Sequence, residues 1–127
     1  MEDQTARQEI QETIKDLKQK DLAELGGLKC PAGKIHQVFQ VVEALLTDDT
    51  GAFVTDWATS KNVLKENPLH KLNNVQFEGL AQQVLDACEK VLRDIHDEDI
   101  IKYSTAAAIL TRWAKCVHNH ALKTAKH

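Results

Sequence analysis

The spacing of apolar residues near the end of the chain limits the possible folds more than any other feature of this sequence. From Ile100 to Ala121 such residues recur at intervals of three or four without a break. This is the spacing of one narrow face of an α-helix, of the kind that packs in a coiled coil. Because Asp97 can cap such a helix, and Glu98 and Asp99 suit its first turn, we expect the last helix to follow Asp97 and to run close to the C-terminus.

A second narrow seam lies near the beginning of the chain. Residues 5–25 lack glycine and proline, and the apolar residues from Ile10 to Leu17 lie three or four apart. We expect one long helix, which the glycine pair 26–27 ends or bends. The next apolar residue after Leu17 is Leu22, five positions on, so the register of the seam shifts. Such a shift is explained by a coiled coil that slides between registers or, more simply, by a stutter where a coil enters a globular head.

The middle of the chain predicts helices with broader apolar faces. Pro31 suits the first position of a helix. A broad stripe at helical spacing follows it, made of Ile35, Val38, Phe39, Val42, Leu45 and Leu46. A further helical stripe runs from Phe77 to Ile95.

A short helix is expected between those two. Thr55 or Asp56 can cap it, and the Asn67-Pro68 pair would stop it. No alternating run rich in valine, isoleucine and threonine competes with this helical pattern.

Together these elements predict an all-α fold, with a compact head of about four to six helices on a short antiparallel coiled-coil stub. The chain would form a single domain over residues 1–127. Within it, residues 1–26 would be the outgoing helix of the stub, 27–117 the head and 118–127 the returning helix. Pairing of the two terminal seams predicts that the chain ends lie side by side and antiparallel.

Composition excludes several classes of function. The formal net charge of −3 argues against a general nucleic-acid binder. No apolar run approaches the length of a membrane span, and the polar residues 1–11 do not predict a signal peptide. Three cysteines without a CxxC pair favour a reduced, intracellular protein.

Residues that could carry chemistry are sparse. There is no glycine-rich phosphate loop, HExxH or GxSxG motif, so we expect neither an enzyme nor a cofactor or small-molecule substrate. Cys116 and His120 lie four apart and can share a helix face, whereas His118 points elsewhere. A metal would need another ligand from a different element, so packing is the preferred explanation and no metal is predicted.

Two stretches and one tryptophan resemble a known family. Residues 21–46 read DLAELGGLKCPAGKIHQVFQVVEALL, Trp57 follows a variable loop, and residues 102–113 read KYSTAAAILTRW. Their order and spacing resemble the microtubule-binding domain at the tip of the dynein heavy-chain stalk, over roughly residues 17–120. Cys30 stands where the family usually has a second proline, and residues 71–94 match poorly. These departures suggest a divergent, axonemal heavy chain.

The resemblance implies microtubule binding through a basic face on helices that start near Pro31, Asp56 and Asp97. By position, the contact residues would be Lys34, His36, Lys61, Lys65, Lys102 and Arg112. The partners would be tubulin and the rest of a dynein heavy chain, whose ATPase lies elsewhere in the parent chain. The expected location is the cytoplasm and cytoskeleton, including the axoneme of a cilium or flagellum.

A second hypothesis keeps the fold and changes the partner, so that the chain is a helical module for binding another protein. Residues 100–127 hold five basic and no acidic residues, whereas residues 86–99 hold six acidic and two basic ones. This segregation suits a basic contact face. It also suits helices that each have an ordinary solvated charged face.

Overall fold

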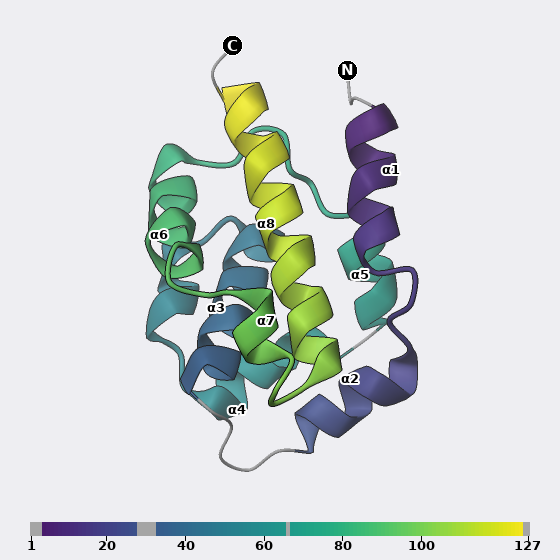
Figure 1. Ribbon diagram of the computed structural model, residues 1–127. Coiled ribbons are helices and arrows are strands. Elements are labelled where there is room, and N and C mark those ends of the chain that lie inside the picture. Colours follow the sequence, from purple (N-terminus) through teal and green to yellow (C-terminus); the bar gives the residue numbers. More distant parts are fainter. Residues whose placement is uncertain (1–3, 28–32, 66, 126–127) are drawn as a thin grey trace.

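The computed structural model describes residues 4–27, 33–65 and 67–125 (Figure 1). Within these ranges the chain forms helices and no strands, so the predicted all-α class is confirmed. The α-helices are α1 (Gln4–Thr13), α2 (Gln19–Gly26), α3 (Gly33–Thr47), α4 (Trp57–Ser60), α5 (Pro68–Asn73), α6 (Gln82–Leu92), α7 (Asp97–Ile100) and α8 (Thr105–Ala125). Two 3-10 helices, η1 (Thr50–Val54) and η2 (Lys61–Leu64), flank α4.

Helix α8 is the centre of the fold. Its apolar seam from Ala107 to Ala121 is buried, and α1, α3, α6 and α7 all pack against it. Trp113 is fully buried on this helix, and its indole nitrogen donates to Leu72 O at 3.1 Å. That bond fixes α5 against α8, because an indole N–H buried without an acceptor would be costly.

The first and last helices run antiparallel and side by side, with the start of α1 and the end of α8 at the same end of the molecule (Figure 1). This confirms the predicted pairing of the terminal seams. Helix α6 also packs against α8. In the C-terminal half of α8, His118 Nε2 donates to Leu85 O at 2.9 Å and so joins the two helices. The boundaries of a stub at residues 1–26 and 118–127 stay a prediction, but this part of α8 already belongs to the core.

The single long helix predicted for residues 5–25 is wrong. The chain leaves the helix after Thr13, and Lys18 is extended at φ −109° and ψ 157° before α2 begins. Asp21 explains the new start, because its carboxylate accepts from the Lys18 backbone N–H at 3.1 Å. The register shift before Leu22 therefore marks a break between two helices, not a sliding coil or a stutter.

The start of the last helix was also predicted wrongly. Asp97 begins the short α7, and α8 starts only at Thr105. Ser104 caps α8 in place of Asp97, because its hydroxyl accepts from the Ala107 N–H at 3.1 Å. As a result Tyr103, which the seam placed on the buried face, is 65% exposed.

Other local predictions are confirmed. Helix α2 ends at Gly26, and the stripe from Ile35 to Leu45 faces the core. Asp56 caps α4, accepting from the Thr59 N–H at 2.8 Å. Pro31 lies outside the described residues, so its place at the start of this helix stays a prediction.

Two boundaries in the middle of the chain are refined. Asn67-Pro68 separates η2 from α5 as predicted, and Pro68 is also the first residue of α5. Phe77 is buried as expected, but α6 begins only at Gln82. An arginine of α1 fixes the segment between α5 and α6: the Arg7 guanidinium donates to Asn73 O at 2.9 Å and to Val75 O at 2.6 Å.

Candidate functional site

Three of the six predicted contact residues come from elements that meet at one end of the molecule. Lys34 lies at the start of α3, Lys61 at the junction of α4 and η2, and Lys102 between α7 and α8. These elements lie at the end opposite both chain termini (Figure 1). Lys34 and Lys102 are exposed, and Lys61 is half-buried.

Two of these lysines also hold the fold together. Lys34 Nζ donates to Asp94 O at 3.1 Å, which joins the start of α3 to the segment after α6. Lys61 Nζ donates to Gly26 O at 3.3 Å, where a cation suits the negative end of the α2 dipole. It also lies 5.9 Å from the centre of the Trp57 ring. Of the three lysines, only Lys102 makes no such hydrogen bond or cation–π contact with another described residue.

His36 has an intramolecular role. Its Nε2 donates to Thr55 O at 3.0 Å, and Gln40 donates to the same oxygen at 3.0 Å. The imidazole also meets Trp57 edge-on, with ring centres 6.0 Å apart. His36 therefore positions the connection between η1 and α4 and is only half-exposed to a partner.

The other two predicted residues come from the end of η2 and from α8. Lys65 follows η2, and its carbonyl accepts from Lys71 Nζ at 2.5 Å. Arg112 is exposed on α8 and lines a surface hollow of about 400 Å³ together with Glu12 and Asp16 of the α1–α2 region. Lys15 and Ile101 line the same hollow, so Arg112 has both acidic and basic neighbours there.

The turn between α7 and α8 holds a feature that the sequence reasoning missed. Ile101 is 45% exposed and Tyr103 65% exposed, and Lys102 lies between them, also exposed. We call residues 101–104 the α7–α8 turn. The signal that could have revealed it is Ser104, a good helix cap directly before the small-residue run that opens α8.

The basic residues Arg112 and Lys115 of α8 have different surroundings. Arg112 lies in the hollow near α1, whereas Lys115 lines a different hollow, with Glu89 and Arg93 of the α6 region. The acidic α7 directly precedes the α7–α8 turn. Arg112 and Lys115 therefore face different neighbours, and a basic face at the start of α3, the α4–η2 junction and the α7–α8 turn stays a prediction.

A cavity of about 480 Å³ lies between α3, η2, α5 and the α5–α6 connection. Glu43 lines it, and the Oε2 atom of this glutamate is buried without a hydrogen-bond partner. Burial raises the pKa of the Glu43 carboxyl. A hydrogen bond from the Thr55 hydroxyl lowers this pKa in part, and the charge of Asp49 raises it further. A carboxylate held in this way destabilises the folded state when it ionises.

Replacing Glu43 with glutamine is expected to raise the melting temperature at pH 7. The folded-state pKa lies above the unfolded value, so the native protein loses stability as pH rises from about 4.5 through the folded pKa. A neutral amide removes that loss. Melting curves of Glu43→Gln and of the exposed control Glu89→Gln at pH 4 and pH 7 would measure it. Equal pH dependence in wild type and Glu43→Gln would contradict the assignment.

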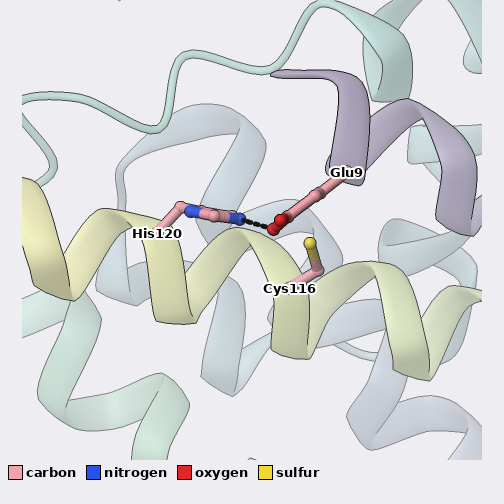
Figure 2. A group of neighbouring side chains, drawn as sticks. All are labelled: Glu9, Cys116 and His120. Atoms are coloured by element: carbon pink, nitrogen blue, oxygen red, sulfur yellow. Dashed lines mark hydrogen bonds and ion pairs between the residues drawn. The ribbon is translucent and has the colours of Figure 1, made fainter. Parts of the chain in front are cut away.

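A second group of polar side chains lies between the first and last helices. Glu9 comes from α1, whereas Cys116 and His120 come from one face of α8 (Figure 2). Each of these residues offers one possible ligand atom: a carboxylate oxygen, Sγ and an imidazole nitrogen. The three atoms lie within 4.8 Å of one another. The shortest contact is His120 Nε2 to Glu9 Oε2, at 2.6 Å.

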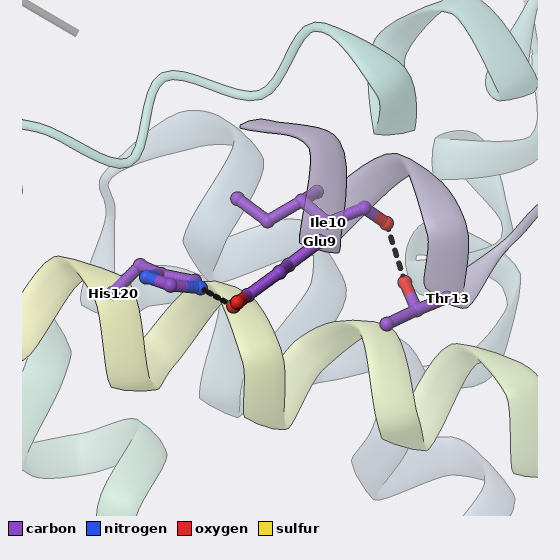
Figure 3. Close-up of polar contacts among 4 residues, drawn as sticks. All are labelled: Glu9, Ile10, Thr13 and His120. Atoms are coloured by element: carbon purple, nitrogen blue, oxygen red, sulfur yellow. Dashed lines mark hydrogen bonds and ion pairs between the residues drawn. The ribbon is translucent and has the colours of Figure 1, made fainter. Parts of the chain in front are cut away.

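The neighbours of Glu9 on α1 hold that helix in place (Figure 3). Ile10 is fully buried, and the Thr13 hydroxyl donates to Ile10 O at 2.5 Å in the last turn of α1. The position of the Glu9 backbone is therefore set by packing, although 57% of its side chain is exposed.

The remaining described cysteine has a different environment. Cys88 is fully buried on α6, and burial raises the pKa of its thiol to about 12. Such a thiol stays protonated at neutral pH and acts as a small apolar side chain.

Comparison with known proteins found no match to this chain among protein-family models, curated proteins or solved structures. The resemblance to the dynein stalk tip therefore stays a prediction that rests on the quoted residues. Among the described residues, no helix is both long enough and apolar enough to cross a membrane.

Proposed function

We propose that this protein is a non-enzymatic helical module that binds an acidic protein surface through the α7–α8 turn, and that this surface belongs to the microtubule. One observation carries the proposal: Lys102 lies between the exposed apolar side chains of Ile101 and Tyr103 at the end remote from both termini. The resemblance of residues 102–113 to the last head helix of the dynein stalk tip supplies the identity of the partner.

The chemistry of the α7–α8 turn suits a docking contact. An exposed tyrosine offers a large, rigid contact area and is enriched among residues that dominate binding energy. A neighbouring lysine speeds encounter with an acidic surface and sets orientation. Lys34 and Lys61 add positive charge at the same end, although each also makes an internal hydrogen bond.

The position of the chain ends supports the same proposal. The start of α1 and the end of α8 lie at the end opposite the α7–α8 turn (Figure 1). A parent chain attached there would leave the turn free to meet a partner, which is the arrangement that a stalk tip requires.

Replacing Lys102 with glutamate is expected to weaken microtubule binding by at least about tenfold at low salt, because a like charge facing an acidic surface repels it. The matched control is Lys90→Glu, which makes the same charge change at an exposed site on α6. Co-sedimentation with stabilised microtubules at low and moderate salt would measure both. Wild-type binding should fall as salt rises.

Two outcomes would overturn parts of this proposal. If Lys102→Glu and Lys90→Glu lose microtubule affinity equally, the net charge of the protein controls binding and the α7–α8 turn is not the contact. Absence of wild-type pelleting at low salt, with the helical circular dichroism spectrum intact, would reject tubulin as the partner. The hypothesis of another protein partner would then remain, supported by the exposed Ile101 and Tyr103.

A further inference from the structure

Three side chains that lie far apart in sequence meet between α1 and α8. Cys116 and His120 are four residues apart, so both project from one face of α8. The sequence alone left this pair without a third ligand from another element. The structure supplies it, because the Glu9 carboxylate of α1 reaches the same place (Figure 2).

We propose that Glu9, Cys116 and His120 form a binding site for Zn²⁺ that joins the first helix to the last. A set of one thiolate, one imidazole and one carboxylate matches the mixed ligands that zinc accepts. Softer or harder ions fit less well, because Cu⁺ favours more sulfur and Mg²⁺ or Ca²⁺ favour oxygen alone. Three protein ligands leave the fourth tetrahedral position to water.

The geometry needs only small changes to hold the ion. Zinc bonds of about 2.3 Å to sulfur and about 2.0–2.2 Å to nitrogen and oxygen separate tetrahedral ligand atoms by roughly 3.3–3.7 Å. The three atoms already lie within 4.8 Å of one another, and the Glu9–His120 contact of 2.6 Å would open by about 1 Å. The Glu9 side chain is 57% exposed, so it can rotate while the packed backbones stay in place.

The surroundings hold the two α8 ligands more firmly than Glu9. The side chain of His120 is only 10% exposed, and its ring lies 6.1 Å from that of Phe77. Cys116 is half-buried, and this burial raises the pKa of its thiol. The charge of Glu9 raises the pKa further, and the charge of Lys123 lowers it. Zinc binding therefore replaces the thiol proton, which leaves to solvent as the Zn–S bond forms.

An ion pair alone would explain only part of this arrangement. Glu9 and His120 can pair without a metal, and the thiol would then be a packing group. The contrast with His118 favours a site, because that histidine is turned away and donates to Leu85 O. In the described part of the chain, these three residues are the one group of three or more side chains with metal-ligand spacing.

Titration of the untagged protein with Co²⁺ tests the proposal, because cobalt takes the place of zinc and is coloured. We expect one tetrahedral cobalt per chain, with a thiolate-to-cobalt charge-transfer band that Zn²⁺ abolishes by competition. Cys116→Ser should lose the charge-transfer band, and Glu9→Gln and His120→Ala should weaken zinc binding by more than about 100-fold. Loss of an outer-shell partner already costs about 10–100-fold. Controls are Cys30→Ser, which removes another thiol, and Glu12→Gln, an exposed carboxylate on the same helix as Glu9.

A second measurement is independent of colour. Zinc that joins α1 to α8 should raise the melting temperature of the wild type and of the controls, and should not raise that of Glu9→Gln. Glu9→Gln changes an exposed side chain, so the variant should remain folded. Absence of the charge-transfer band in the wild type, or the same zinc affinity in Glu9→Gln as in Glu12→Gln, would overturn the proposal.

Discussion

Replacing Trp113 with alanine is expected to lower the free energy of unfolding by about 3–5 kcal/mol, a large part of the ~5–15 kcal/mol typical of a domain. The indole is fully buried at the centre of α8. The substitution removes its packing and also leaves Leu72 O without the N–H that it accepts from. Urea denaturation followed by circular dichroism would measure the change.

A pair of controls separates the two causes. Trp113→Phe keeps much of the apolar contact but not the hydrogen bond, so it should cost about 1–3 kcal/mol, the usual penalty for an unpaired buried group. Trp57→Ala should cost less than Trp113→Ala, because Trp57 is only half-buried. A smaller loss in Trp113→Ala than in Trp57→Ala would contradict the central place of α8.

Replacing Ile10 with alanine is expected to destabilise the whole protein by about 2–5 kcal/mol. Ile10 is fully buried where α1 packs against α8, and α1 is too short to be stable by itself. The measurement is again urea denaturation, and the control is Gln8→Ala at an exposed position of the same helix.

The result bears on the predicted division of the chain. If residues 1–26 were a stub that only leads to the head, Ile10→Ala would loosen α1 and leave the unfolding midpoint of the rest almost unchanged. If α1 belongs to the core, one cooperative transition should shift as a whole. A separate early transition confined to α1 would therefore contradict the packing described here.

Local patterns in the sequence predicted much of the fold. The stripe from Ile35 to Leu45 is wide and regular, so its helix and its buried face were both predicted. Thr55 or Asp56 was predicted as a cap, because an oxygen-bearing side chain before a helix satisfies its first N–H groups, and the structure has Asp56 in that place. The antiparallel pairing of the ends followed from two seams that each need a partner.

The errors arose where local signals compete. At Ser104 the apolar spacing continues while a side-chain cap starts a new helix, and the spacing was given too much weight. At Lys18 the spacing slips between Leu17 and Leu22, and the slip was interpreted as a change of register within one helix. The candidate sites were predicted only in part. Lys34, Lys61 and Lys102 come from elements that lie at one end of the molecule, Lys65 and Arg112 come from the end of η2 and from α8, and a shared contact face stays a prediction. The meeting of Glu9 with His120 joins residues 111 positions apart, which no local pattern contains.

The pairing of α1 with α8 has a consequence for synthesis in the cell. A ribosome releases the first helix early, but the surface that covers Ile10 belongs to a helix that follows about one hundred residues later. At about 5–20 residues per second, that surface appears roughly 5–20 s afterwards. During this interval a ten-residue helix has little stability of its own, so its apolar side chains stay uncovered. The fold can therefore close only after translation has delivered α8.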